Sequence, residues 1–369
     1  MLYKLLYSLT EYVSGFNLMR YITFRSAIAA ITALLFSFIL GPRIIKKLSA
    51  MQLTETIRAS GPTTHQVKAG TPSMGGLIIL GATLLPMLLF GDLSNIYVQL
   101  ILIAMVWMGL VGFLDDYLKT VKRKKEGLIA RYKLAGQIAL GIFIGVVFYL
   151  HPDFADLGTK TTIPFFKNYV LDFQWWWLYI AFIVFVITAT SNSVNLADGL
   201  DGLASGLMAI AILVFAAIAY ISGRADFSQY LNIFYLPGAG ELTVYCAALI
   251  GAILGFLWYN ARPAEVFMGD TGSLAMGAAL GALAVMLRKE FLLPFAAAVF
   301  IIESISVILQ VRYFQYTKKK YGEGRRLFKM APLHHHFELK GWNENKIVIR
   351  FWILGILFAM LTLTTFKIR

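Results

Sequence analysis

The polar residues best suited to chemistry in this chain are aspartates, which occur in short clusters between long apolar stretches. Asp115 and Asp116 are adjacent, and Asp198 and Asp201 follow Asn195 at three-residue intervals. Adjacent carboxylates repel each other unless a cation lies near them. Hard cations such as Mg²⁺ bind carboxylate oxygens and keep waters and phosphate oxygens as their other ligands. Taken alone, the pair Asp115-Asp116 fits two interpretations equally well: a site for a divalent cation and a phosphate, or a solvated acidic pair beside the basic run that follows.

Each aspartate cluster also predicts a local geometry. On a helix, Asp115 and Asp116 diverge by about 100°, so one can bind metal while the other contacts substrate or protein. If 195–201 is helical, Asn195, Asp198 and Asp201 form one polar stripe. Capping of the next helix is the alternative, but a single aspartate suffices for that. Three polar residues at this spacing therefore favour a site, and the glycines at 199 and 202 would let a ligand approach the backbone.

A third motif runs from Phe267 to Ser273 and opens an apolar segment. It is not a P-loop, because no Gly-Lys-Ser/Thr follows. Asp270 is either a helix N-cap or a metal ligand beside backbone N–H groups that face a phosphate. Taken alone, the motif favours the cap. Phe267 either stacks on a base or touches lipid.

Three consecutive histidines, His334, His335 and His336, form the last motif. Neighbouring side chains on a helix or strand cannot all point one way, so a three-histidine zinc site is not expected. A cluster facing phosphate fits better, since Arg325 and Arg326 lie nearby. The alternative is an exposed polar loop.

The elements that must position these motifs are membrane helices. The chain has 369 residues, of which 59% are hydrophobic and 14% charged, against about 25% charged in ordinary soluble proteins. A spanning helix needs roughly 20 mostly apolar residues. We predict an all-α, polytopic integral membrane protein with about ten transmembrane helices, in one domain covering 1–369. The predicted spans are 24–41, 74–91, 97–114, 134–150, 174–191, 203–221, 241–258, 272–287, 290–310 and 348–366.

The distribution of Lys and Arg predicts the orientation of these spans. If both termini lie outside, the five inner segments hold 23 of the 33 basic residues. The net charge of +13 is then read as an orientation signal rather than as a nucleic-acid surface. All the motifs above fall on the inner side, as an enzyme working at the cytoplasmic face requires. A transporter would place more ionisable residues at mid-membrane, where Glu303 is the main exception.

Two smaller expectations concern the membrane segments themselves. The pairs Gly251 and Gly255, and Gly277 and Gly281, have the spacing that lets helices approach closely, and we assign them to packing. The stretch before residue 24 reads as an amphipathic interfacial helix. The single cysteine excludes a disulfide framework within the chain.

These residues resemble a known family, the phospho-N-acetylmuramoyl-pentapeptide-transferases, within the polyprenyl-phosphate N-acetylhexosamine-1-phosphate transferase superfamily. The resemblance covers nearly the whole chain, from Tyr21 to Trp352. Its most specific stretches are Thr71-Pro72-Ser73-Met74-Gly75-Gly76, Asp115-Asp116-Tyr117, 195–202, 267–273 and Pro332-Leu333-His334-His335-His336-Phe337. The histidine element is similar to the muramoyl-pentapeptide branch rather than to the N-acetylglucosamine-phosphate branch.

The resemblance implies roles for individual residues and a Mg²⁺-dependent reaction. Asp270 resembles the Mg²⁺ ligand, Asp115 and Asp116 resemble the catalytic pair, and the three histidines resemble a cluster near the sugar and phosphates. The residues that resemble substrate contacts are Lys68, Lys133, Asn195, Asp198, Asp201, Asn260, Phe267 and Gly269, with Phe267 stacking on uracil.

The implied partners are UDP-N-acetylmuramoyl-pentapeptide, undecaprenyl phosphate and the surrounding membrane lipid, in a bacterial inner membrane with the site on its cytoplasmic face. The products would be UMP and the first lipid-linked peptidoglycan precursor. A sibling transferase using UDP-N-acetylglucosamine and a transporter of an anionic solute are the alternatives. The oligomeric state stays open, and a homodimer is compatible with the sequence.

Overall fold

The computed structural model describes residues 2–51, 70–122, 124, 127–166 and 170–366, and most of them are helical. In this part of the chain, nine helices are long and apolar enough to cross a membrane, and a tenth, α3, has 15 residues. Their bounds are α2 (Ile22–Ala50), α3 (Gly76–Phe90), α4 (Ile96–Thr120), α5 (Ala130–Leu150), α6 (Trp176–Ala197), α7 (Leu203–Ser222), α9 (Glu241–Asn260), α10 (Gly269–Met286), α12 (Ala298–Tyr321) and α14 (Glu344–Thr364). Each of the ten predicted segments overlaps one of these helices, so the all-α polytopic membrane fold is confirmed.

The shorter elements lie mainly at the ends of the bundle. They are α1 (Leu2–Ser8), η1 (Ser14–Arg20), η3 (Pro152–Phe154), β1 (Lys160–Thr162), β2 (Val170–Asp172), α8 (Ala225–Tyr230), α11 (Leu293–Ala296) and α13 (Leu333–Glu338). The two strands pair antiparallel. No alternation of apolar residues in the sequence predicts them. The stretch before α2, expected to be one amphipathic helix, forms α1 and η1 instead.

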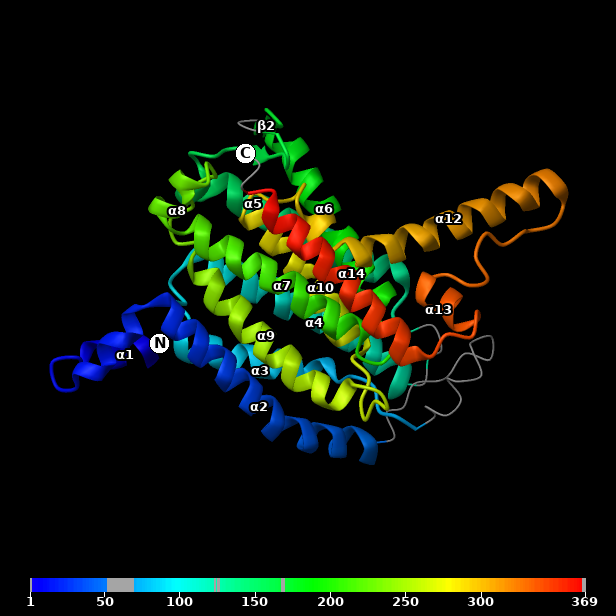
Figure 1. The fold of residues 1–369 in the computed structure, drawn as a ribbon, viewed down its shortest axis with the longest axis horizontal. Coiled ribbons are helices and arrows are strands. Elements are labelled where there is room, and N and C mark those ends of the chain that lie inside the picture. Colours follow the sequence, from blue (N-terminus) through cyan, green and yellow to red (C-terminus); the bar gives the residue numbers. More distant parts are fainter. Residues whose placement is uncertain (1, 52–69, 123, 125–126, 167–169, 367–369) are drawn as a thin grey trace.

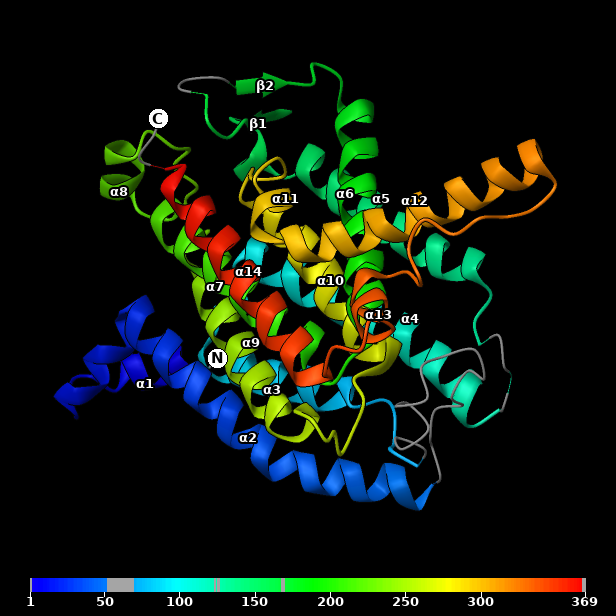
Figure 2. The same ribbon diagram turned by 45° about the vertical axis from the view of Figure 1, so that its right-hand side comes forward.

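The helix α10 is the centre of the bundle, and it packs against α4 on one side and α6 on the other (Figures 1 and 2). Every residue from Thr271 to Met286 is buried, and half of them are glycine or alanine. A Cβ at Gly277 would lie 2.7 Å from the Cα of Ser191 on α6. On the far side of the bundle, a Cβ at Gly255 would collide with Ser37 on α2. The predicted packing role of these glycines is confirmed, because small residues let helix backbones meet.

The ninth span differs from its predicted bounds of 290–310. The apolar residues after Glu290 form a buried turn and the short helix α11, and the long helix α12 begins only at Ala298. It then continues to Tyr321, beyond the apolar stretch, and its second half projects from the bundle (Figures 1 and 2). Hydropathy reports where a segment is apolar, but a helix continues for as long as its backbone hydrogen bonds do.

The three charged residues between α10 and α11 are buried rather than exposed as a hydrophilic loop. Glu290 accepts a hydrogen bond from the hydroxyl of Tyr179 at 2.6 Å, and Lys289 donates to Thr162 at 3.0 Å. Burial raises the pKa of the Glu290 carboxyl, against the opposing effect of Arg288. This cluster anchors the strand β1 to the end of α10.

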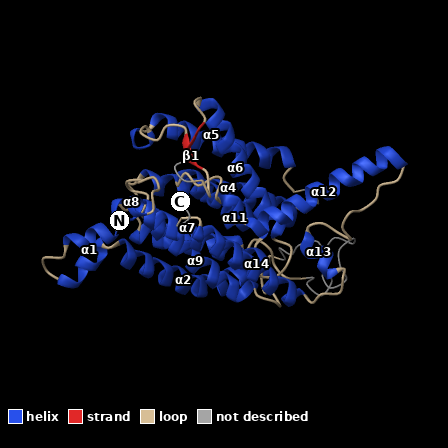
Figure 3. Ribbon diagram, turned by 45° about the horizontal axis from the view of Figure 1, so that its top comes forward, coloured by secondary structure: helices blue, strands red, loops and turns tan. Residues whose placement is uncertain are grey.

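Both chain termini lie on the side of the molecule away from α13 (Figures 1 and 3). The ends of α4, α6 and α10 that carry the aspartate motifs point toward the α13 side. A chain that crosses a membrane an even number of times has both of its termini on the same side. Which side faces the cytoplasm stays a prediction.

Candidate active site

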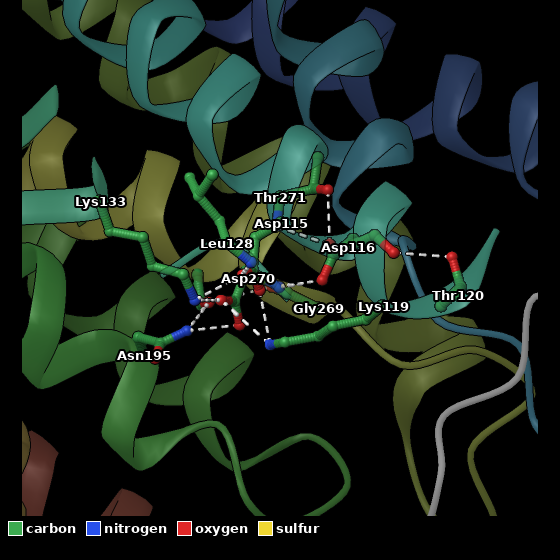
Figure 4. Close-up of polar contacts among 11 residues, drawn as sticks. Asp115, Asp116, Lys119, Thr120, Leu128, Lys133, Asn195, Gly269, Asp270 and Thr271 are labelled. Carbon is green, nitrogen blue, oxygen red and sulfur yellow. Dashed lines mark hydrogen bonds and ion pairs between the residues drawn. The ribbon is translucent and has the colours of Figure 1, made fainter. Parts of the chain in front are cut away.

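Asp115, Asp116 and Asp270 meet at one end of the bundle, where α4 ends and α10 begins (Figure 4). The side chains of Asp115 and Asp116 are 0% and 3% exposed. With Asp270 they form a group in which one oxygen from each carboxylate lies within 4.8 Å of the others. The two adjacent aspartates diverge, as the helical geometry predicts, and they take different partners.

Asp115 lies at the centre of an ion-pair network. Its carboxylate contacts Lys133 Nζ at 2.9 Å and Lys119 Nζ at 2.5 Å, and it accepts a hydrogen bond from the main-chain N–H of Leu128 at 2.7 Å. The chain reaches Leu128 by turning at Gly127, which has a φ of +59°, where a Cβ would lie 2.6 Å from Asp115 Oδ1. The backbone at Gly127 and Leu128 thus lies against Asp115, and α5 carries Lys133 to the site.

Asp270 shares the same two cations. Its Oδ2 lies 2.5 Å from Lys133 Nζ and 3.4 Å from Lys119 Nζ, and Oδ1 accepts a hydrogen bond from Asn195 Nδ2 at 2.9 Å. With 14% of its side chain exposed, Asp270 is more accessible than Asp115. Two carboxylates therefore flank two ammonium groups, and their charges balance unless a further cation binds.

Asp116 performs a different task, because it caps the helix that carries Asp270. Its Oδ1 accepts a hydrogen bond from the main-chain N–H of Asp270 at 3.1 Å, and its Oδ2 accepts from the N–H and the hydroxyl of Thr271 at 2.9 and 2.6 Å. The first N–H groups of a helix lack partners within that helix. The cap of α10 therefore comes from another helix. Asp270 makes no cap hydrogen bond, so our preference for it as an N-cap was wrong.

Close backbone approach makes this capping possible. A Cβ at Gly112 on α4 would overlap the carbonyl of Asp270, and a Cβ at Gly76 would overlap the backbone of Gly272. The segment before α3 adds two main-chain hydrogen bonds, from Gly75 to Phe267 and from Gly76 to Met268, each 2.8 Å long. This contact explains why the stretch 71–76 belongs with the aspartate motifs.

The predicted polar stripe of Asn195, Asp198 and Asp201 is not helical. The helix α6 ends at Ala197, and Asp198 is its C-terminal flanking residue, with a ψ of 58°. The turn that follows passes through Gly202 at a φ of +76°. Glycines at both 199 and 202 favour this turn over a continued helix, because glycine lowers the conformational free energy of such a turn. Asn195 therefore contacts Asp270, whereas Asp201 lies in the turn and contacts Ala264.

Asp201 and Asn260 belong to a buried network behind the turn. The carboxylate of Asp201 accepts from Ala264 N at 3.3 Å, and its main-chain N–H donates to Glu344 at 3.1 Å. The Asn260 side chain accepts from Gly202 N and donates to Val266 O at 2.9 Å. Both residues are at most 5% exposed. Their assignment as substrate contacts stays a prediction, but the structure already uses both side chains to connect the loop 261–268 with the turn at 202.

Two further predicted contacts lie on the segment that enters α10. Gly269 has a φ of +72°, and a Cβ there would lie 2.6 Å from Asp116 Oδ2, so glycine is required for the capping contact. Phe267 is half-buried, with its backbone paired to Pro72 and Gly75. The remaining predicted lysine, Lys68, lies outside the described residues.

The three histidines occupy α13 and face three directions. His334 is fully buried, and its ring meets that of His335 edge-on with centroids 4.2 Å apart. His335 Nδ1 pairs with Glu338 at 2.7 Å, and His336 Nδ1 accepts from Lys329 N at 3.1 Å. Burial lowers the pKa of His336, and Lys340 and Lys329 lower it further, which matches the acceptor role of its ring. The predicted divergence of the histidines is confirmed.

The donor set of the aspartate group fits a hard cation. Among the described residues, it is the group of carboxylate, histidine or cysteine side chains close enough to share a metal ion, and it offers only oxygens. Asp270 is the most exposed of the three carboxylates, at 14% of its side chain against 0% for Asp115 and 3% for Asp116, so it is the one best placed to hold an ion. Oxygen donors and a nearby phosphate are the environment that Mg²⁺ prefers.

Sequence reasoning missed two members of the site. Lys119 lies one helical turn after Asp115, and that i, i+4 spacing was the signal available for it. Thr271 follows Asp270 directly, but nothing in the sequence shows that its hydroxyl serves a carboxylate on another helix.

The chain resembles known proteins over its whole length. The model of glycosyl transferase family 4 matches residues 98–288, which include the three aspartates and Asn195. A phospho-N-acetylmuramoyl-pentapeptide-transferase signature matches residues 68–80, which include Pro72, Gly75 and Gly76 beside the start of α10.

Curated relatives extend the similarity to both ends of the chain. The chain is 55% identical over 381 residues to the phospho-N-acetylmuramoyl-pentapeptide-transferase of Gemmatimonas aurantiaca, and 49% identical over 369 residues to that of Thermodesulfovibrio yellowstonii. Both alignments cover 100% of this chain and 100% of the relative. The chain therefore belongs to the phospho-N-acetylmuramoyl-pentapeptide-transferase family, within glycosyl transferase family 4.

Proposed function

We propose that this membrane transferase moves phospho-N-acetylmuramoyl-pentapeptide from UDP-N-acetylmuramoyl-pentapeptide to undecaprenyl phosphate, with UMP as the second product. The observation that carries the proposal is the pairing of Asp115 and Asp270 with Lys119 and Lys133 at one end of a bundle of membrane helices. A site there can be reached by a soluble nucleotide from water and by a lipid phosphate from the bilayer. The family relationship supports the identity of both substrates.

The reaction is a phosphoryl transfer between two anions. An oxygen of the lipid phosphate attacks the β-phosphorus of the UDP substrate, the bond from that phosphorus to the bridging oxygen breaks, and UMP leaves with the bond's electrons. Such transfers need positioning and charge neutralisation more than covalent chemistry from the protein. Lys119 and Lys133 offset the repulsion between the two substrates and the charge that develops on the leaving group.

The aspartates have separate roles in this proposal. Asp116 holds the start of α10, and Asp115 and Asp270 position the two lysines. Asp115, the buried partner of both lysines, accepts the last proton of the lipid phosphate where one is present. Mg²⁺, held by Asp270 with Asp115 beside it, would neutralise pyrophosphate charge. The nucleoside would be held by Phe267, with Asn195, Asp198 and Gly269 as further contacts.

The histidines of α13 are proposed to lie along the sugar and phosphates. The active site would face the cytoplasm of a bacterial inner membrane, because 23 of the 33 basic residues fall on that side in the ten-span topology.

A UMP-release assay on the purified protein tests the proposal. We expect UMP only when UDP-N-acetylmuramoyl-pentapeptide, undecaprenyl phosphate and Mg²⁺ are all present, with one lipid-linked sugar formed per UMP. Release from UDP-N-acetylglucosamine instead would reassign the chain to the sibling activity. Counterflow of an anionic solute in liposomes, without UMP release, would show that the protein is a transporter and would contradict the proposal.

A further inference from the structure

Glu303 is a buried carboxylate to which the proposed reaction gives no role. It lies on α12 with none of its side chain exposed. Its Oε1 accepts a hydrogen bond from the main-chain N–H of His334 at 3.2 Å and lies 3.4 Å from His334 Nδ1. A carboxylate taken out of water is costly unless its surroundings compensate. The compensation visible here comes from one residue of α13.

The ring of His334 extends this contact toward the active site. It is fully buried, and its Nε2 side packs against Gly199, where a Cβ would collide with the ring. Gly199 lies just after the end of α6 and four residues after Asn195, whose side chain donates to Asp270. Contacts therefore run without a gap from Glu303 through His334 and the turn at 199 to the aspartate group.

The geometry also orients the imidazole. A carboxylate oxygen 3.4 Å from Nδ1 favours the tautomer with the proton on Nδ1, because that N–H then faces the negative charge. Nε2 is then the nitrogen that faces the turn at Gly199. Glu303 is thus the charged partner on α12 that acts on the rotation and the tautomer of His334.

We propose that Glu303 is a positioning residue for the histidine helix. Its carboxylate anchors α13 through the main-chain N–H of His334, and it orients the ring that packs against the turn at Gly199. The effect on turnover rests on the proposed transferase function, whereas the anchoring of α13 does not depend on it.

Two substitutions separate the anchoring from the orientation. Glu303→Gln keeps a side-chain oxygen that can accept from His334 N–H but removes the charge opposite Nδ1. Glu303→Leu removes both. Ser304→Ala is the matched control, because Ser304 is the next residue of α12 and its hydroxyl donates to Phe300 O within the same helix.

The full-length protein in detergent would be measured by hydrogen exchange of the peptide 333–338 and by UMP release. For Glu303→Gln we expect exchange at the wild-type rate, with kcat lower by about tenfold or more and the KM for the UDP substrate unchanged. Glu303→Leu should lose kcat and also exchange faster across α13. The control should match the wild type in both measurements.

Two results would overturn the proposal. Unchanged exchange in Glu303→Leu would refute the anchoring of α13, and unchanged kcat in Glu303→Gln would refute the orientation of His334. If the wild type releases no UMP at all, the transferase proposal fails, while the exchange experiment still decides whether Glu303 anchors α13.

Discussion

Asp116 on α4 accepts hydrogen bonds from both the main-chain N–H and the hydroxyl of Thr271, at 2.9 and 2.6 Å, so one helix supplies the N-terminal cap of another. Asp270 precedes Thr271, and its own N–H donates to the same carboxylate. The position of Asp270 in the site therefore depends on Asp116. This relationship separates two adjacent aspartates that look equivalent in the sequence.

Asp116→Asn should lower both stability and activity, because the new amide group brings N–H donors against the donors of α10. Leaving buried donors without an acceptor costs about 1–3 kcal/mol. We expect a lower melting temperature in detergent and a matching loss of UMP release. Thr120→Val is the control, since the Thr120 hydroxyl donates to the main chain of Asp116 and not to its carboxylate. A variant as stable and active as the wild type would contradict the capping role.

Asp115→Asn distinguishes direct attack from a covalent route. If Asp115 only removes a proton from the lipid phosphate, the variant should recover part of its rate as the pH rises and the phosphate ionises without help. A nucleophilic aspartate could not be replaced in this way. We expect recovery at high pH, measured as UMP release across a pH series. A stoichiometric burst of UMP without lipid acceptor, with phospho-sugar trapped on Asp115, would show that direct attack is wrong.

Asp270→Asn should retain the fold and lose activity by about a hundredfold or more, as expected when the charge stabilisation supplied by a metal is lost. Raising the Mg²⁺ concentration should restore part of the rate. The control is Asp226→Asn, whose carboxylate pairs with Arg224 on the exposed surface away from the site. Wild-type turnover of Asp270→Asn at low Mg²⁺ would remove Asp270 from the metal site.

Phe267→Ala should raise the KM for the UDP substrate if the ring stacks on uracil. Base–aromatic stacking contributes roughly 1–3 kcal/mol, so a KM increase of about fivefold or more is expected. Phe185→Ala is the matched control, because Phe185 lies on α6 with 65% of its surface exposed. An unchanged KM would assign Phe267 to packing.

Cysteine labelling in intact cells tests the orientation. We expect a cysteine introduced at His335 to be protected from a membrane-impermeant reagent, because α13 belongs to the predicted cytoplasmic side. Cysteines introduced near either terminus should be labelled. Cys246 is fully buried and serves as an internal background. Labelling at position 335 would show that the predicted orientation is inverted.

The sequence alone predicted the membrane fold, because that depends on a local property of the chain. A run of apolar residues long enough to cross a bilayer is visible without any tertiary information. Asp115, Asp270, Lys133 and Asn195 could be identified by their types and by the family resemblance, and they do meet in the structure.

Tertiary structure alone decided which contacts each of these residues makes. The ninth span begins at Ala298 because the preceding apolar residues are buried in a turn, and hydropathy does not distinguish a buried turn from a span. Asp201 left the predicted stripe because α6 ends at Ala197. Asp116 became a cap because α4 crosses the start of α10 at Gly112. A carboxylate's partner is set by which backbone lies within about 3 Å of it. Asp116 and Asp270 are 154 positions apart in the chain and reach that distance only because their helices pack together.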